Sequence, residues 1–298
     1  MLKQETTAKS VPSRGKLNKI PTGVVTFDPI IRGGFPSGSV ILLIGEAGAG
    51  NAEFAYTSAS MLSLFKLNPA LYDSTKKQLD AFMINNECLK LPDTICYISF
   101  SHAKEDIMKE LEYSFPQGFQ DAFESKSFIF KDFSYFCPES TNLETDNGWK
   151  SMKGTKHEEK LLLLRELIST LEFYSRNGLV IIDSLVSLRR ACCLEWLDFI
   201  SFLEELHKKS KKWGGMIYLQ LGTGIFEINK EEEIMDIVDG VLVFEWAQDA
   251  FARQQTMYLR KFRGILPNII KDNMVRFDTM ITNTDGYVVK NVKRISGR

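Results

Sequence analysis

Residues 39–54 read SVILLIGEAGAGNAEF and combine an apolar run, a glycine-rich turn and the start of a helical pattern. The first part, 40–44, holds only aliphatic residues and has the composition of a strand that is buried on both faces. A turn with three glycines, Gly45, Gly48 and Gly50, follows without a break. A helical pattern begins at Glu53. The stretch therefore predicts a strand, a glycine-rich turn and a helix in immediate succession.

The turn has the spacing of the phosphate-binding loop GxxxxGK followed by Ser or Thr. In such a loop, backbone N–H groups cradle a phosphate and the positive N-terminus of the next helix adds to the attraction. Here Asn51 takes the lysine position and Ala52 the hydroxyl position, so the side chains that grip a terminal phosphate and a magnesium ion are missing. The predicted nucleotide-binding residues are Gly45, Glu46, Ala47, Gly48, Ala49, Gly50, Asn51, Ala52 and Glu53.

Two carboxylates bear on whether this loop could bind phosphate and a metal ion, Glu53 and Asp183. Glu53 would repel phosphate if it pointed into the loop, whereas on the outside it would only favour the helix N-terminus. Asp183 ends the apolar run LVIID at 179–183, where a nucleotide-binding fold of this kind holds its metal-binding carboxylate. We therefore take Asp183 as a candidate magnesium ligand.

The rest of the chain alternates between strand-like and helical patterns. Further strands are predicted at 94–100, 128–133, 179–183, 215–221 and 241–245, and helices at 53–65, 104–113, 158–174 and 194–212. This alternation predicts an α/β fold with a mostly parallel sheet covered by helices on both faces. Strands at 256–262, 274–278 and 287–290 have no helices between them, so we expect antiparallel C-terminal strands. Asn177 and Gly178 end the predicted helix at 158–174, with Gly178 as the expected left-handed cap.

We expect a flexible basic arm over 1–19 and a single domain over 20–298. Insertions are expected near 68–93, with a short helix at 76–82, and near 138–156. The segment 222–233 reads as a loop just past a strand end, where open α/β sheets face their ligands.

Bulk composition limits the function classes. The chain has 298 residues and a formal net charge of −1, so no overall field attracts nucleic acid or an anionic membrane. Its apolar runs are far shorter than the roughly 20 residues that span a bilayer, and its first residues lack the apolar core of a secretory signal. The five cysteines form no CxxC pair and the three histidines show no metal-site spacing. We expect a cytoplasmic protein with reduced thiols and no membrane association.

The stretch 20–56 resembles the entry segment of the KaiC and RadA branch of the RecA superfamily. That segment reads TGI, then LD, then a leucine with Gly-Gly, then IPxGSVxLIxGxPGAGKT. The matching positions here are Thr22, Gly23, Asp28, Gly33, Gly34, Pro36, Gly38 and Ser39. LVIIDSLVSL at 179–188 looks like the family's second nucleotide motif, and YLRKFRG at 258–264 like its KMRG-type segment. The resemblance covers most of 20–295 and implies a RecA-like fold, with Lys261 and Arg263 reaching the phosphates of a neighbouring subunit.

The chain departs from the family at the residues that drive hydrolysis. The family places one or two glutamates after its second strand to activate water, whereas Ser101 and His102 stand there in this chain. His102 is a candidate general base, with an inert surface histidine as the alternative. Together with Asn51 and Ala52, three parts of the hydrolytic machinery are altered, and phosphoryl transfer depends almost wholly on positioning and charge.

The leading hypothesis is a regulatory or scaffolding protein of this kind with a degenerate site. It would bind ATP or ADP weakly, with Mg²⁺ weakly held, or bind no nucleotide. The resemblance implies self-association or pairing with an active paralogue. A second hypothesis is an active ATPase in which Lys261, Arg263 or lysines of the arm replace the missing lysine. A third is a DNA-binding recombinase paralogue that uses the arm and the 222–233 loop, but the acidic residues of that loop would repel a phosphate backbone, so we expect no DNA partner.

Overall fold

The computed structural model describes residues 17–83, 87–134, 156–249, 252–262 and 275–294. Its helices are α1 (Asn51–Leu67), α2 (Pro69–Asp80), α3 (Lys104–Ser114), α4 (Gly118–Phe123), α5 (Lys156–Tyr174), α6 (Leu185–Ala191), α7 (Trp196–Trp213) and α8 (Ile228–Ile237). Its strands are β1 (Leu17–Ile20), β2 (Phe35–Pro36), β3 (Ser39–Gly45), β4 (Glu87–Leu89), β5 (Ile95–Ser99), β6 (Phe128–Asp132), β7 (Leu179–Asp183), β8 (Met216–Gly222), β9 (Gly240–Asp249), β10 (Ala252–Phe262), β11 (Val275–Thr282) and β12 (Gly286–Arg294).

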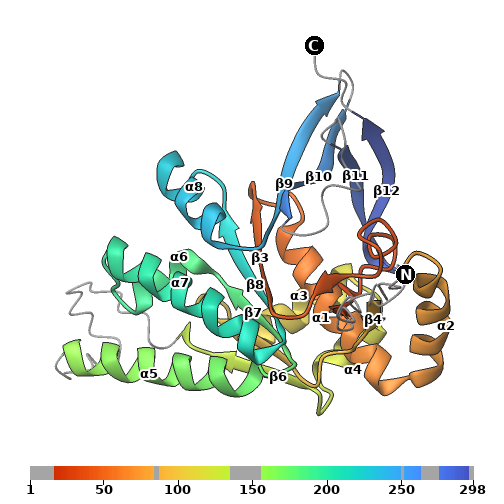
Figure 1. Ribbon diagram of the computed structural model, residues 1–298. Coiled ribbons are helices and arrows are strands. Elements are labelled where there is room, and N and C mark those ends of the chain that lie inside the picture. The colour runs from red at the N-terminus through yellow and green to blue at the C-terminus, as the bar shows by residue number, and fades with distance from the viewer. Residues whose placement is uncertain (1–16, 84–86, 135–155, 250–251, 263–274, 295–298) are drawn as a thin grey trace, which may run out of the picture.

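A nine-stranded sheet organises the molecule, with the strand order β12-β11-β10-β9-β3-β8-β7-β5-β6 (Figure 1). The strands from β9 to β6 in this order run parallel, and β9 to β12 pair antiparallel along the chain. This arrangement confirms the predicted α/β class, a RecA-like, mostly parallel sheet with antiparallel C-terminal strands. The apolar run of β3 becomes the strand between β8 and β9, where both faces are buried.

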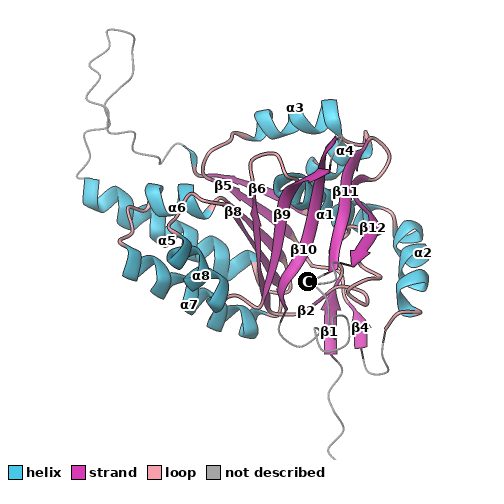
Figure 2. Ribbon diagram, turned by 90° about the horizontal axis from the view of Figure 1, so that it is seen from above, coloured by secondary structure: helices cyan, strands magenta, loops and turns pink. Residues whose placement is uncertain are grey.

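The two faces of the sheet carry separate layers of helices, which Figure 2 shows from above. Ile41 and Leu43 of β3 point to the layer that contains α1, α3 and α4. Val40, Leu42 and Ile44 alternate to the opposite face and pack with α5, α6, α7 and α8. Because successive side chains of a strand point to opposite faces of the sheet, β3 contributes to both hydrophobic cores.

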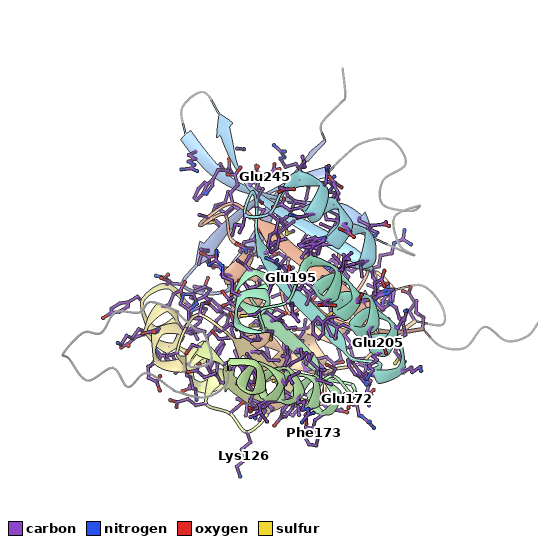
Figure 3. The ribbon with its side chains drawn as sticks, turned by 90° about the vertical axis from the view of Figure 1, so that its left-hand side faces the viewer. Lys126, Glu172, Phe173, Glu195, Glu205 and Glu245 are labelled. Carbon is purple, nitrogen blue, oxygen red and sulfur yellow. The ribbon has the colours of Figure 1, made fainter. Side chains whose placement is uncertain are left out.

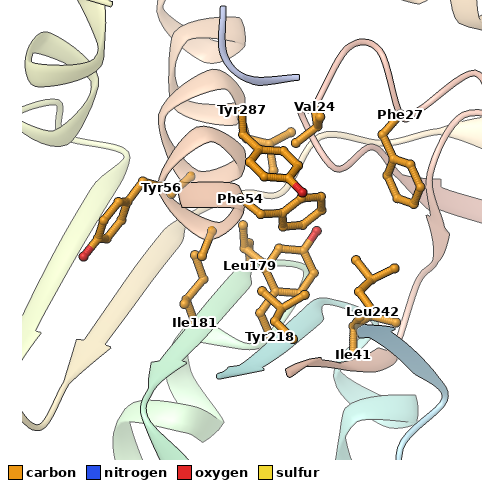
Figure 4. Packing of buried hydrophobic residues seen from close by; sticks show 14 of the residues in the cluster. Val24, Phe27, Ile41, Phe54, Tyr56, Leu179, Ile181, Tyr218, Leu242 and Tyr287 are labelled. Atoms are coloured by element: carbon orange, nitrogen blue, oxygen red, sulfur yellow. The ribbon is translucent and has the colours of Figure 1, made fainter. Parts of the chain in front are cut away.

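Phe54, on the first turns of α1, anchors the helix to the sheet directly behind the glycine-rich turn (Figure 4). Its ring meets those of Phe244 and Tyr287 edge-on, with centroids 5.7 and 5.6 Å away. Tyr218 of β8 lies 6.1 Å away on the sheet side. Burial of large aromatic rings is a major source of packing energy, so this contact set fixes where α1 starts relative to β3.

A small second sheet, β2-β1-β4, holds the entry segment of the domain. Asp28 is buried there and accepts hydrogen bonds from the backbone N–H and hydroxyl of Thr22, both at 2.7 Å, and from the N–H of Gly23 at 3.1 Å. Lys19 is also buried and pairs with Glu87 at 3.1 Å. Buried hydrogen bonds from Thr22 and Gly23 to Asp28 therefore hold the entry segment in place.

The structure differs from two of the local predictions. The segment 222–233 was expected to be a loop, but α8 begins at Ile228, because acidic residues favour a helix N-terminus and Ile234 and Met235 bury its inner face. The helix expected at 76–82 is the longer α2, which starts at Pro69 with the Asn68 side chain accepting from the N–H of Leu71.

The cap after α5 also differs from the prediction. Asn177, with φ of 52°, takes the left-handed conformation that was expected of Gly178. Gly178 is needed for another reason, because a Cβ there would lie 2.0 Å from the carbonyl oxygen of Tyr174. The helix expected at 194–212 begins at Trp196, and the separate short helix α6 precedes it. The expected arm over 1–19 and insertion near 138–156 fall mostly outside the described residues.

Figure 3 looks onto the layer formed by α5 to α8. Phe173 of α5 points outward with 72% of its surface exposed, next to Glu172, which pairs with Lys209 of α7. Within the described ranges, no helix is long and apolar enough to cross a membrane.

Candidate nucleotide site

The glycine-rich turn joins β3 to α1, as the sequence predicts: Gly45 ends the strand and Asn51 begins the helix. Gly48 and Gly50 have φ of 70° and 112°, a region that side chains rarely adopt. A Cβ on Gly50 would also lie 2.7 Å from the ring of Tyr287, so this position must be glycine. A glycine-rich turn that leads into a helix N-terminus is the arrangement that binds anions in phosphate-binding loops, and anion binding by this turn stays a prediction.

The outer side of the turn is fastened to the hairpin formed by β9 and β10. Trp246 donates its indole N–H to the carbonyl of Ala47 at 3.1 Å, and its backbone N–H to the Glu46 carboxylate at 3.3 Å. Gln255 donates its amide to the carbonyl of Gly48 at 2.8 Å. The three consecutive loop residues Glu46, Ala47 and Gly48 are therefore hydrogen-bonded to the β9–β10 hairpin.

The three positions after the glycines differ chemically from those of an ATPase. The Asn51 amide folds back onto Gly45, with its Cγ 3.2 Å from where a Cβ on that glycine would sit. Ala52 presents only a methyl group and offers no oxygen to a metal ion. Glu53 lies within the first turn of α1, and burial raises the pKa of its carboxyl.

Asp183 lies at the carboxyl end of β7 with 8% of its surface exposed. The hydroxyl of Tyr97 donates to its Oδ2 at 2.8 Å, and Gln220 in turn donates its amide to that hydroxyl at 3.3 Å. The described residues contain no group of three or more His, Cys, Asp or Glu side chains placed to hold a metal ion. Ala52 lacks the oxygen that its position would contribute to Mg²⁺, so Asp183 alone of the two predicted metal-binding positions offers an oxygen, and its role as a magnesium ligand stays a prediction.

His102 follows β5 and lies next to Asp183. Its Nδ1 is 3.8 Å from Oδ2 of Asp183 and 3.1 Å from the hydroxyl of Ser101, and 56% of its side chain is exposed. Interaction with Asp183 raises the pKa of His102, although partial burial opposes this. The backbone is fixed by Ser99, whose hydroxyl accepts from the N–H of His102 at 3.0 Å. The role of His102 as a base stays a prediction.

The structure describes one of the two residues expected to reach a neighbouring subunit. Lys261 donates through Nζ to the carbonyls of Met235 and Asp236, both at 2.7 Å, in the last turn of α8. Within one subunit it therefore caps a helix whose C-terminus carries partial negative charge. Arg263 lies outside the described residues, and the trans role of both residues stays a prediction.

Several residues of the site could not be found from sequence. Trp246 and Gln255 reach the loop across 199 and 207 positions of chain, and no local spacing marks them. Tyr97 lies within an apolar strand run and reads as an ordinary core residue. Glu110 lies on α3, where its pKa is raised by burial and by the nearby Glu53. Only the fold brings these groups to one place.

Comparison with known proteins supports the architecture. No family profile and no curated protein sequence matches the chain. A solved structure, that of the KaiC-like protein PH0186 from the hyperthermophilic archaeon Pyrococcus horikoshii OT3, matches with a TM-score of 0.57 and 18% identity. The match covers 92% of this chain and 100% of that one. At this identity the likeness concerns the fold alone, and the chain therefore has a KaiC-like, RecA-type P-loop fold.

Proposed function

We propose that this chain is a KaiC-like protein whose ATP site is degenerate and which acts as a regulatory or scaffolding protein rather than as an efficient ATPase. The observation that carries the proposal is the pairing of Asp183 with the Tyr97 hydroxyl at 2.8 Å, opposite a loop that offers Asn51 and Ala52. The carboxylate that would hold a metal ion accepts a hydrogen bond from a phenol, and the hydroxyl expected at position 52 is replaced by the methyl group of Ala52.

The loss of the loop lysine weakens the grip on a terminal phosphate. A hydrogen bond from a charged donor contributes about 1.5–3 kcal/mol net, so its absence lowers affinity on the order of tenfold to a hundredfold. Asn51 offers at best a neutral hydrogen bond. Glu53, in the first turn of α1, supplies no positive charge in place of the lysine. ATP or ADP would therefore bind weakly, with Mg²⁺ weakly held.

The position of the water-activating glutamate supports the same reading. Ser101 and His102 stand there, and the imidazole is turned towards Asp183. Phosphoryl transfer requires charge stabilisation of the transferring group, which this set of side chains supplies poorly. A protein that keeps the fold but not this chemistry fits a role in assembly, through self-association or with an active paralogue in the cytoplasm.

Calorimetry with ATP and Mg²⁺ on the pure protein, paired with a phosphate-release assay, tests the proposal. We expect binding weaker than about 100 μM and no turnover above the buffer blank. Steady turnover that disappears in Asp183→Asn would overturn the proposal in favour of an active ATPase. Glu172→Gln, on the outer face of α5, is the matched control for a carboxylate change away from the site.

A further inference from the structure

Charged side chains divide the outward face of α7 into an acidic half and a basic half. The inner face of the helix buries Phe199, Leu203 and Leu206. The opposite face carries exposed side chains at spacings of three and four residues, so they form one stripe along the helix. This α7 stripe consists of Leu197, Asp198, Ser201, Glu204, Glu205, Lys208 and Lys212. All of its carboxylates precede both of its lysines.

The helix dipole accounts for only part of this division. Acidic residues stabilise the first turn of a helix and basic residues the last turn, and the effect falls off beyond those turns. Asp198 lies in the first turn of α7 and Lys212 in the last. Glu204, Glu205 and Lys208 lie in the middle turns, so the dipole does not require their charges.

Within one subunit, the charges of the stripe have no salt-bridge partner among the described residues. Lysines at the two edges of α7 are engaged, because Lys209 pairs with Glu172 of α5 at 2.6 Å and Lys211 pairs with Asp239. None of the ion pairs in the described ranges contains a member of the α7 stripe. Glu205 is labelled in Figure 3, on the layer that faces the viewer. The stripe is therefore an exposed helix face with segregated charge.

We propose that two copies of the chain associate through their α7 stripes, with the two helices antiparallel. The inference rests on the self-association in the proposed function and names a surface that includes neither the glycine-rich turn nor Lys261. Antiparallel pairing brings each acidic half onto the basic half of the partner, whereas parallel pairing would bring like charges together. A two-fold axis makes this contact self-complementary, as in most protein dimers.

The spacing of the charges sets the register of the pair. With the two-fold axis at the level of residue 206, Glu204 lies level with the partner's Lys208. Each residue adds about 1.5 Å along a helix, so Lys212 comes within about one turn of the partner's Asp198. Because exposed ion pairs are weak and are screened by salt, we expect a weak dimer that dissociates as the salt concentration rises.

Apolar side chains at the border of the stripe add contact area. Leu197 begins the stripe and is 77% exposed. Phe173 of α5 is 72% exposed and follows Glu172, which the pair with Lys209 holds against α7. Burial of such side chains favours association independently of salt.

Sedimentation equilibrium of the full chain tests the proposal at about 50 mM and about 500 mM sodium chloride. The acid-reversed variant carries Glu204→Lys with Glu205→Lys, and the base-reversed variant carries Lys208→Glu with Lys212→Glu. The control, Glu105→Lys with Glu112→Lys on the exposed face of α3, changes the net charge as the acid-reversed variant does. Lysine and glutamate both favour helices, and circular dichroism checks the fold of each variant.

We expect the wild type and the control to form dimers at low salt, with an association constant at least about tenfold lower at high salt. Each reversed variant alone should associate at least about tenfold more weakly than the wild type, because like charges then face each other. An equimolar mixture of the two reversed variants should form a heterodimer, which also shows that both are folded. If a double variant does not fold, Glu204→Lys and Lys208→Glu carry the same comparison.

A wild type that stays monomeric at low salt would overturn the proposal. Reversed variants that associate as tightly as the wild type would also overturn it, because association would then use another surface. Either result leaves the degenerate ATP site untouched, since nucleotide binding and turnover are measured separately. Steady ATP turnover, in contrast, would overturn the proposed function and leave the dimer standing.

Discussion

The indole N–H of Trp246 donates a hydrogen bond to the carbonyl oxygen of Ala47 at 3.1 Å. This contact crosses from the β9–β10 hairpin to the glycine-rich turn. In a loop that depends on its ligand for order, the phosphate holds the backbone from inside. Here the hairpin holds it through hydrogen bonds from another part of the chain, so we expect the turn to keep its shape without a bound anion.

Replacing Trp246 with Phe should loosen the turn selectively. The ring is kept and one hydrogen bond is removed, so we expect a loss of about 0.5–1.5 kcal/mol in the free energy of unfolding. Amide exchange at residues 46–50 should accelerate. Trp196→Phe is the control, because that indole donates to Glu233 at 2.7 Å far from the turn. Equal exchange rates in both variants would show that the hairpin does not order the loop.

The lysine and hydroxyl that the loop lacks can be restored by substitution at Asn51 and Ala52. Asn51→Lys with Ala52→Thr should raise ATP affinity about tenfold to a hundredfold, because a charged donor and a hydroxyl return to the cradle. The measurement is a thermal-shift titration with ATP and Mg²⁺. The control is Ser201→Thr, on the exposed face of α7 in the other layer of helices. An unchanged titration would count against a phosphate-loop geometry.

Asp28 gives the entry motif a pH dependence. Burial raises its pKa to about 7, although three hydrogen bonds from Thr22 and Gly23 oppose this. Between the unfolded value near 4 and this folded value, the native state holds a proton that the unfolded chain has released. Stability from this group is therefore greatest at low pH and is lost as the pH rises towards 7, by up to about 1.4 kcal/mol per pH unit.

Urea unfolding at about pH 5 and about pH 8 measures this effect in the wild type and in Asp28→Asn. The asparagine does not titrate, so its pH slope should be smaller, although losing an acceptor makes it less stable by about 1–3 kcal/mol. Identical slopes in the two proteins would mean that Asp28 stays ionised in the fold.

The backbone of Cys193 lies in the left-handed region, where a residue other than glycine is strained, and substitution by glycine tests this strain. Cys193 closes α6 with φ of 47°, and its N–H and that of Leu194 bond the carbonyls of Arg190 and Arg189 at 3.1 Å, the pattern that usually ends in glycine. Cys193→Gly should stabilise the protein by about 0.5–1 kcal/mol in chemical unfolding. Cys193→Ala removes the thiol but keeps the strain, so it should bring no gain. Equal stability of the two variants would place the effect in the thiol.

The parts of the fold that sequence could predict are those with a strong local pattern. The short apolar runs of β3 and β7 favour strands buried on both faces, and the glycines from Gly45 to Gly50 mark the turn. The short strands β1, β2 and β4 carry too few residues for a period of two to show, and β1 even buries Lys19. Helix α8 looked like a loop because its sequence is acidic, and only packing of Ile234 and Met235 shows its inner face.

In the candidate site, too, some residues could be predicted from local sequence and others could not. The loop residues and Asp183 follow from motif spacing, whereas the partners that decide their chemistry come from other strands. Tyr97 on β5 and Trp246 on β9 meet the site through tertiary contacts, and their hydrogen bonds have no counterpart in local sequence.

Lys261 distinguishes a structural role from a role between subunits. Its Nζ donates to the Met235 and Asp236 carbonyls at 2.7 Å, so Lys261→Met should uncap α8 and lower the free energy of unfolding by about 1–2 kcal/mol. Arg260→Met is the matched control: its partner Glu232 is half exposed, and a surface pair of this kind contributes about 0–1 kcal/mol. Chemical unfolding measures the first effect, and light scattering with and without ATP measures self-association. A variant that keeps full stability but no longer associates would assign Lys261 to a neighbouring subunit's site, because a side chain needed only as a cap cannot change assembly without changing the fold that it caps.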